Sequence, residues 1–329
     1  MRHVLHADGR KELVLTVEKD NLDMIQEIRN IKNYSFNPVL ESNETLYDTP
    51  VTLFDKPWRI MDDFWMKHVH IKITDHCNAH CPFCIEKESH IKDDPIKLMA
   101  NLKRLIAELD SQGHLATVSI TGGEPSLNPI AGNVVDFLKG NYKVFLNINT
   151  NFSKTIDSLL DPDWVNISRH KVGSDDYTGI GDLDLDMLDK YRAKHPNTKI
   201  RLQCVLHPHG LQSVEEIKDY IDHYNGYIDD FSFRRLINVT EKAPTEDLFQ
   251  KLKHFLYNNS TFVEQVLKDY YVYETWNYKG MNITQSHSNM KLLHDLEGME
   301  DDKILREIVV HPDGLIAGSW YRNKKIISE

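Results

Sequence analysis

Hydrophobic and polar positions alternate along several short stretches of the chain, and stretches with helical spacing separate them. Alternation over about four to eight residues predicts a β-strand, whereas apolar residues three and four positions apart predict a helix. The strand pattern occurs at His68–Thr74, Ala116–Ile120, Lys143–Asn149, Trp164–Ser168, Lys199–Leu206 and Asp230–Arg235. The helical pattern occurs between them at Pro95–Asp110, Ala131–Lys139, Leu183–Lys194 and Val214–Tyr224. This order predicts an α/β fold with a parallel sheet and helices outside it.

The chain on either side of this pattern has a different character. Residues 1–65 contain a strand-like LVLTV and a helical NLDMIQEIRNI. After residue 240 we expect a helix over Glu246–Asp269 and then hairpin strands, with turn residues at His311–Gly314. We therefore predict an N-terminal extension over 1–65, a core over 66–240 and a C-terminal α+β cap over 241–329.

Composition and charge narrow the classes of function. The chain has 329 residues, of which 40 % are hydrophobic and 27 % are charged, as is typical of a globular protein. The formal net charge of −11 disfavours a surface that neutralises many phosphates, so we expect no extended nucleic-acid binding. The sequence contains no run of about eighteen apolar residues and no apolar stretch at its N-terminus. We therefore expect a cytoplasmic protein without a membrane partner.

Three of the four cysteines lie within one short segment. Cys77, Cys81 and Cys84 have the spacing C-x₃-C-x₂-C, whereas a disulfide framework spreads cysteines to join distant segments. Thiolates suit zinc or an iron–sulfur cluster. A closed zinc site needs four ligands, and three thiolates on a four-iron cluster leave one iron open. A non-catalytic zinc site stays possible, since a fourth ligand is available from His76, His80 or His90.

The cysteine segment resembles the hallmark of the radical S-adenosylmethionine (SAM) superfamily, C-x₃-C-x-aromatic-C, with Phe83 at the aromatic position. The segment Thr121–Pro125 (TGGEP) resembles the GGE motif of that family. The resemblance implies a partial (β/α)₆ TIM-like barrel and an oxygen-sensitive [4Fe–4S] cluster on Cys77, Cys81 and Cys84. It further implies that one electron, from a donor such as flavodoxin or ferredoxin, cleaves SAM to a 5′-deoxyadenosyl radical that abstracts hydrogen from a substrate.

The resemblance also implies where SAM binds. Gly122, Gly123 and Glu124 are expected to hold its amino group, and Phe83 to support its adenine side. The strand ends of the next two predicted strands supply the further candidates Asn149 and Ser168. Ser168 is about as well explained as an ordinary residue at the end of a strand. Phe152 departs from the family, which often has glycine at this point of a Thr-Asn-Gly turn.

Strand alternation also predicts a polar interior. Side chains alternate between the two faces of a strand, so His68, His70 and Lys72 share one face, as do Arg201 and Gln203. Because the apolar faces must meet the outer helices, we expect these residues to line a hydrated lumen. We predict a polar, anionic small-molecule or nucleotide-like substrate there, although the same side chains could instead satisfy one another and water. Cys204 falls on the apolar face, where a small buried side chain is expected.

The C-terminal segment around His311–Gly314 resembles the Pro-Asp-Gly hairpin of SPASM or twitch extensions. Those extensions carry auxiliary iron–sulfur clusters, but Ser319 stands where a cysteine is usual and no cysteine follows Cys204. We therefore expect no all-cysteine auxiliary cluster, which favours a redox-neutral reaction. A rival hypothesis is a ribosomal-peptide-modifying radical SAM enzyme, such as an epimerase, in which residues 1–65 bind a leader peptide.

Overall fold

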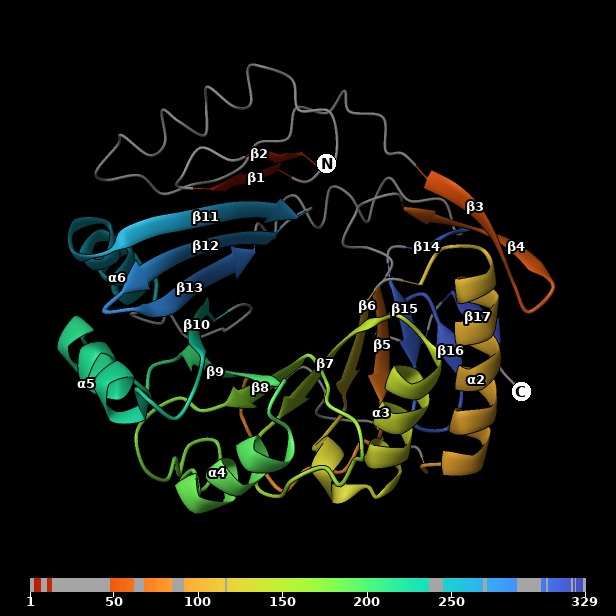
Figure 1. The fold of residues 1–329 in the computed structure, drawn as a ribbon, viewed down its shortest axis with the longest axis horizontal. Helices are drawn as coiled ribbons and strands as arrows, with labels where there is room; N and C mark the ends of the chain where they lie inside the picture. Colours follow the sequence, from red (N-terminus) through yellow and green to blue (C-terminus); the bar gives the residue numbers. More distant parts are fainter. Residues whose placement is uncertain are drawn as a thin grey trace. The chain divides into compact units, whose positions relative to one another are not determined.

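The computed structural model describes residues 3–6, 11–13, 48–61, 68–84, 92–115, 117–236, 245–268, 271–288, 303–305, 307–320, 322 and 324–327 (Figure 1). The chain divides into two compact units, each made of separate segments. The first, which we call the cysteine unit, comprises Leu46–Ser168, Gly173–Arg201 and Asp301–Glu329. The second, which we call the antiparallel unit, comprises Met1–Thr45, Arg169–Val172 and Leu202–Glu300.

The main sheet of the cysteine unit has the strand order β17-β16-β15-β5-β6-β7-β8, with the start of β9 beside β8. Strands β15, β5, β6, β7 and β8 are parallel, whereas β15, β16 and β17 form antiparallel pairs. The core strands are β5 (His68–Lys72), β6 (Thr117–Thr121), β7 (Phe145–Thr150), β8 (Trp164–Ser168) and β9 (Lys199–Leu206). The C-terminal strands are β15 (Ile308–Val310), β16 (Ile316–Ala317) and β17 (Lys325–Ile327). The predicted α/β fold with a parallel sheet is confirmed, and the sheet is open.

Apolar side chains of this sheet are buried on one face, as the alternation predicted. They include Val69, Ile71, Val118, Ile120, Leu146, Ile148, Val165 and Ile167. Helix α2 (Pro95–Ser111) begins at Asp94, whose side chain accepts a hydrogen bond from the Lys97 backbone N–H, and it buries a leucine-rich stripe. The 3₁₀ turn η1 (Pro125–Leu127) and helix α3 (Ile130–Asn141) pack on β7.

Two smaller features complete the edge of the cysteine unit. Strands β3 (Asp48–Leu53), β4 (Lys56–Met61) and β14 (Ile304–Leu305) form a three-stranded sheet in the order β14-β4-β3. The predicted hairpin at His311–Gly314 joins β15 to β16 and lies against the start of α2. There the Asp94 N–H donates to the Pro312 carbonyl and the Asn101 amide donates to the Gly314 carbonyl, both at 2.8 Å.

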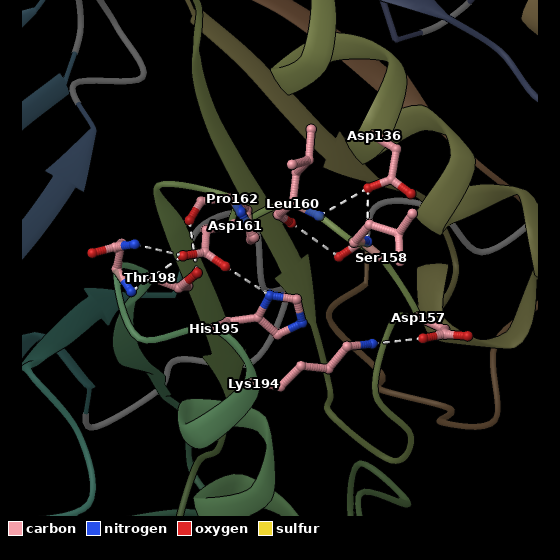
Figure 2. Close-up of polar contacts among 11 residues, drawn as sticks. Asp136, Asp157, Ser158, Leu160, Asp161, Pro162, Lys194, His195 and Thr198 are labelled. Carbon is pink, nitrogen blue, oxygen red and sulfur yellow. Dashed lines mark hydrogen bonds and ion pairs between the residues drawn. The ribbon is translucent and has the colours of Figure 1, made fainter.

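Polar contacts attach the segment between β7 and β8 to helix α4 (Leu185–Lys194), as Figure 2 shows. His195 Nδ1 lies 3.0 Å from Asp161 Oδ1, and Lys194 Nζ lies 2.7 Å from Asp157 Oδ1. On the other side, Asp136 Oδ1 of α3 accepts hydrogen bonds from the backbone of this segment. These contacts hold the segment that connects β7 to β8, in which residues 151–163 form neither helix nor strand.

The antiparallel unit contains β9 from Leu202 onward and has the strand order β9-β10-β13-β12-β11-β1-β2. Strand β10 is parallel to β13, and the remaining described pairs from β13 to β2 are antiparallel. Its other elements are β1 (His3–His6), β2 (Lys11–Leu13), α5 (Val214–Tyr224), β10 (Asp230–Arg235), α6 (Thr245–Asn259), β11 (Thr261–Lys268), β12 (Tyr271–Tyr278) and β13 (Met281–Ser288).

One expected element is wrong in part. A helix was expected over Glu246–Asp269, but α6 ends at Asn259 and Thr261–Lys268 forms β11. The sequence Asn-Asn-Ser interrupts the helix, and the following β-branched and aromatic residues pair with β12. The helix expected at NLDMIQEIRNI lies outside the described residues, and the division at residues 65 and 240 stays a prediction. Among the helices that the structure describes, none combines the length and apolarity needed to cross a lipid bilayer.

Candidate metal and cofactor site

The three clustered cysteines lie in the loop that follows β5. Hydrogen bonds shape this loop at its start, where the Thr74 hydroxyl donates to Asp93 Oδ2 at 2.6 Å and accepts from the His76 N–H at 3.1 Å. The loop tightens again at its end, where the Cys84 N–H donates to the Cys81 carbonyl at 3.0 Å. Cys77 and Cys84 are exposed, and Cys81 is half-buried. The loop therefore presents three thiols at the carboxyl-terminal end of a core strand.

The electrostatics of these thiols favour a bound cation. Burial, together with the charges of Cys84 and Cys77, raises the pKa of Cys81 to about 12. Burial also raises the pKa of Cys77, and the charges of Glu124 and Cys84 add to the effect. The charge of Cys84 thus makes Cys77 and Cys81 harder to ionise. Because metals bind the thiolate form, a positively charged metal group is the partner that would hold all three deprotonated.

The Gly-Gly-Glu turn after β6 is joined to the cysteine loop through the main chain. The Gly123 N–H donates to the Thr74 carbonyl and the Glu124 N–H donates to the His76 carbonyl, both at 2.7 Å. A Cβ atom at Gly123 would lie 2.1 Å from the His76 oxygen, and one at Gly122 would lie 2.4 Å from the Thr74 oxygen. Only glycine permits this approach. The two motifs that were identified separately in the sequence are therefore adjacent.

The Glu124 carboxylate accepts hydrogen bonds from groups of the protein itself. The side chain is 1 % exposed. Its Oε1 accepts from the Ser126 N–H at 3.0 Å and the Thr150 hydroxyl at 2.5 Å, and its Oε2 accepts from the Asn151 N–H at 2.5 Å. Within the described part of the chain, nothing donates to the carbonyls of Gly122 and Gly123. The turn therefore leaves those two carbonyls as acceptors for an ammonium group, and a contact of Glu124 with SAM stays a prediction.

The end of β7 contacts the same loop. The Asn151 amide donates to the Asn78 side chain at 2.8 Å. Phe152 adopts a left-handed conformation with φ of 53°. This conformation favours glycine, although phenylalanine occupies the position. Its ring is buried and meets Tyr191 edge-on, with ring centroids 5.5 Å apart. The ring packing offsets the backbone strain.

The further SAM candidates Asn149 and Ser168 lie half-buried on the polar face of the sheet. The Asn166 amide donates to Asn149 Oδ1 at 3.0 Å. On the same face the Ser119 hydroxyl donates to Asn147 Oδ1 at 2.8 Å. Two hydrogen-bonded pairs thus connect β6 to β7 and β7 to β8 on the polar face.

The structure places the lumen candidates in different surroundings. Lys72 is 3 % exposed and its Nζ lies 3.0 Å from Asp75 Oδ1, so its charge is neutralised within the protein. The Arg201 guanidinium lies over the Trp164 ring, 4.0 Å from its centroid. Gln203 belongs to the antiparallel unit, where its amide oxygen, oriented to satisfy both groups, accepts from Arg234. The side chain of His68 lies outside what the structure describes.

His70 has partners from the C-terminal segment of the chain. Its Nε2 lies 3.6 Å from Glu307 Oε2, and that oxygen accepts from Trp320 Nε1 at 2.8 Å. The rings of His70 and Trp320 are 4.7 Å apart. Because β15 is parallel to β5, with Val309 opposite His70, Glu307 belongs to the polar face. No local pattern in the sequence signals this strand pairing.

The residues present fit an iron–sulfur cluster better than a single ion. Soft thiolates are the ligands that such a cluster requires. Among the described residues, no three His, Cys, Asp or Glu side chains converge on one metal ion. Three thiolates on a four-iron cluster bind three different iron atoms, so they need not converge. His90, one candidate for a fourth zinc ligand, lies outside the described residues.

The chain belongs to the radical SAM superfamily, whose family model matches residues 71–256, more than half of its length. Membership of this family implies a [4Fe–4S] cluster and SAM as the cofactors.

Curated relatives match over shorter stretches. An uncharacterized protein of Methanocaldococcus jannaschii is 27 % identical over 135 residues, which cover 40 % of this chain and 45 % of that protein. GTP 3′,8-cyclase of Clostridium perfringens is 27 % identical over 153 residues, covering 42 % of this chain and 46 % of the cyclase. The matched stretches thus span less than half of these relatives.

A solved structure shows the same fold. SuiB of Streptococcus suis, bound to S-adenosylmethionine, superposes with a TM-score of 0.52 at 16 % identity. The match covers 77 % of this chain and 60 % of that one.

Proposed function

We propose that this chain cleaves SAM reductively at a cluster held by Cys77, Cys81 and Cys84, and that a polar substrate loses a hydrogen atom as a result. When bound, the cluster and SAM supply a 5′-deoxyadenosyl radical as the hydrogen acceptor. One observation carries the proposal: main-chain hydrogen bonds connect the cysteine loop to the Gly-Gly-Glu turn. Both lie at the carboxyl-terminal edge of parallel strands. Active sites of α/β folds gather at this edge.

In this proposal the protein's own residues hold and orient the cofactor. The carbonyls of Gly122 and Gly123 accept hydrogen bonds from the methionine ammonium of SAM. Asn149 and Ser168 offer polar groups on the adjacent face, and Phe83 covers the adenine side. Glu124 acts as a positioning residue, because its carboxylate ties the turn to Thr150 and Asn151. We expect a reduced flavodoxin or ferredoxin to donate the electron, in the cytoplasm.

The proposed substrate is a polar small molecule or a nucleotide-like compound bound on the polar face. His70 and Arg201 are the candidates for recognising the substrate there, whereas the Lys72 ammonium is paired with Asp75. Cys204 is buried, so the 329 residues provide no cysteine set for an auxiliary cluster. This favours a redox-neutral outcome.

Anaerobic reconstitution tests the proposal directly. We expect about four irons per chain and, after reduction with SAM present, formation of 5′-deoxyadenosine. Cys84→Ala should lose both, whereas Cys204→Ala, which removes the buried thiol outside the loop, should keep both. Candidate polar substrates carrying deuterium should transfer it to 5′-deoxyadenosine. One tightly bound zinc per chain, with no 5′-deoxyadenosine, would refute the proposal.

A specific observation favours a second class of substrate. Strands β1 and β2 form an antiparallel pair at the N-terminus, and β1 pairs with β11. In the described chain β2 is the last strand of its sheet. An edge strand can bind an extended peptide by adding it to the sheet. We therefore retain a ribosomally made peptide as the alternative substrate, with an epimerase as one example of the enzyme.

Deuterium transfer separates the two classes of substrate. Short peptides encoded beside the gene would be synthesised with deuterium at their α-carbons and offered to the reduced enzyme with SAM. Label in 5′-deoxyadenosine from such a peptide would support the alternative. Label from polar small molecules alone would exclude it.

A further inference from the structure

A tight turn after β8 lies against the cysteine loop. It runs from Asp175 to Ile180, and the Asp175 N–H donates to the Ile180 carbonyl at 2.8 Å. The Asp175 carboxylate holds the turn from within, because it accepts from the Tyr177 N–H at 3.2 Å and the Thr178 hydroxyl at 2.8 Å. Asp175 is 3 % exposed and Thr178 is fully buried. The turn is therefore a defined element, although it is neither helix nor strand.

The turn contacts the cysteine loop at three successive points. The Thr178 carbonyl accepts from the His80 N–H at 2.8 Å and from the Cys81 thiol at 3.8 Å. Gly179 lies against the His80 ring, so closely that a Cβ atom would be 2.3 Å from Nδ1. Tyr177 and Phe83 pack as a tilted pair with ring centroids 6.4 Å apart. One main-chain bond, one close packing contact and one aromatic pair thus meet around the central cysteine.

The turn also brings a buried carboxylate close to Cys81. The Asp175 carboxylate accepts from the Thr178 hydroxyl at 2.8 Å, and the carbonyl of the same Thr178 accepts from the Cys81 thiol at 3.8 Å, so a single residue links the carboxylate to the thiol. A negative charge at this position disfavours the additional electron of a reduced cluster bound there. Hydrogen bonds, charges and burial around a cluster are the means by which proteins set its reduction potential.

We infer that the Asp175–Ile180 turn is a second support of the metal site, which positions the main chain at His80 and Cys81 and lowers the cluster's reduction potential through Asp175. The inference rests on the cluster ligation given under the proposed function. Asp175 and Gly179 are positioning residues, since neither is proposed to touch iron or SAM. The physical reason for the lower potential is that the reduced cluster carries one more negative charge than the oxidised one, so a nearby carboxylate disfavours reduction.

The electrostatic part is tested by redox titration of the reconstituted holoenzyme, followed by electron paramagnetic resonance (EPR). Asp175→Asn keeps the shape of the side chain and removes its charge, so the midpoint potential should shift to a less negative value. Asp176→Asn is the matched control, because Asp176 is adjacent in sequence, carries the same charge and is exposed. Its midpoint should stay at that of the unchanged protein.

The positional part is tested with glycine variants. Gly179→Ala should lower iron content or alter the EPR spectrum of the reduced cluster. Gly173→Ala should do neither, although its φ of 77° is close to the 71° of Gly179, because a Cβ there meets nothing within 4 Å. The double variant Gly179→Ala with His80→Ala removes the ring that the new Cβ would strike. It should restore iron content and spectrum toward those of Gly173→Ala.

The outcomes distinguish this inference from the proposed function. If the unchanged protein forms no [4Fe–4S] signal after reconstitution, the proposed ligation is wrong and the inference is wrong with it. The inference alone is overturned if the unchanged protein forms a normal cluster and two further results hold. These are that Asp175→Asn has the same midpoint potential as Asp176→Asn, and that Gly179→Ala has the same iron content and EPR spectrum as Gly173→Ala. A less negative potential confined to Asp175→Asn, together with the rescue by His80→Ala, supports it.

Discussion

At the scale of single residues, the strand ends are held together by polar side chains that bind protein rather than solvent. Glu124 is the clearest example, because one buried carboxylate accepts from Ser126, Thr150 and Asn151. It therefore joins the turn after β6 to the end of β7. A carboxylate can do this because it offers acceptors on both oxygens and needs no donor. A residue that the motif associates with the cofactor thus has a structural role that is visible without it.

Glu124→Gln tests this role. The amide nitrogen cannot accept, so at least one of the three donors would be left buried without a partner. Such a loss costs about 2 kcal/mol in the free energy of unfolding, measured by urea denaturation of the metal-free chain. Glu215→Gln, at an exposed position in the first turn of α5, is the control and should change stability far less. Equal effects from the two substitutions would contradict this account of Glu124.

Phe152 gives a second test at the same scale. Glycine at this position would relieve a left-handed conformation that costs about 1–2 kcal/mol. It would also remove a buried ring, at a cost of about 3–5 kcal/mol. We expect Phe152→Gly to destabilise the protein by about 2–3 kcal/mol in urea denaturation. Lys279→Gly, at a comparable φ of 51°, relieves the same strain without losing a buried ring and gives up only an exposed ion pair with Asp222, so it should be neutral to slightly stabilising. A stabilising Phe152→Gly would show that strain dominates.

Single residues differ in how far the sequence predicts them. The cysteine loop and the Gly-Gly-Glu turn follow from motifs and from strand ends, because both are local patterns. The Lys72–Asp75 pair and the contact of His70 with Glu307 do not, since burial and long-range partners decide them. Strand alternation predicted that Lys72 and His70 face a hydrated lumen, but it could not predict that each lies beside a carboxylate.

At the scale of elements, periodicity located the core strands well and the C-terminal elements less well. The alternating strands β7, β8 and β9 have the predicted buried and half-buried faces. The helix expected to continue to Asp269 instead gives way to β11, because short apolar runs fit helix and strand equally well until a partner strand decides. The turn at Asp175–Ile180 has no periodicity and could not be found by this means.

The segment between β7 and β8 allows a test of pH dependence at this scale. Asp161 is partly buried, which alone would raise its pKa, but hydrogen bonds from His195 and Asn197 outweigh burial and lower it. A carboxyl with a depressed folded-state pKa stabilises the fold above its unfolded pKa, near 4, and this stability is lost as pH falls through the folded value.

Asp161→Asn should therefore cost about 1 kcal/mol at neutral pH, a value kept low because solvent reaches the carboxylate. The difference from the unchanged protein should shrink as the pH falls below about 4. Urea denaturation of the metal-free chain at several pH values measures both. Asp157→Asn, which removes the exposed partner of Lys194 (Figure 2), should have a smaller effect. A loss that stays constant with pH would argue against an ionised Asp161.

At the scale of the whole molecule, strands that are far apart in the sequence pair in the same sheet. Strand β15 pairs with β5, so residues near 310 and residues near 70 share one sheet. The cysteine unit therefore includes Asp301–Glu329 together with the core strands near residue 70. Pairing over such a separation leaves no local pattern, because neither strand's composition identifies its partner. The hairpin at His311–Gly314 was found, and its place in the fold was not.

The pairing of β15 with β5 buries His311, so the stability of the fold should depend on the protonation of this histidine. His311, at the end of β15, is 1 % exposed, and burial lowers its pKa to about 4, with the charges of Arg322 and Lys72 adding to the effect. Between about pH 6.5 and 4 the unfolded chain binds a proton at this histidine that the folded chain does not, so stability falls as pH falls across that window. For the metal-free chain we expect His311 to contribute about 2–3 kcal/mol of this loss, measured by urea denaturation.

His311→Gln cannot titrate, so its stability should depend less on pH across the same window, whereas the exposed control His254→Gln should follow the unchanged protein. If His311→Gln lost stability with pH as steeply as the control, the pairing of β15 with β5 would not bury an unprotonated imidazole in solution.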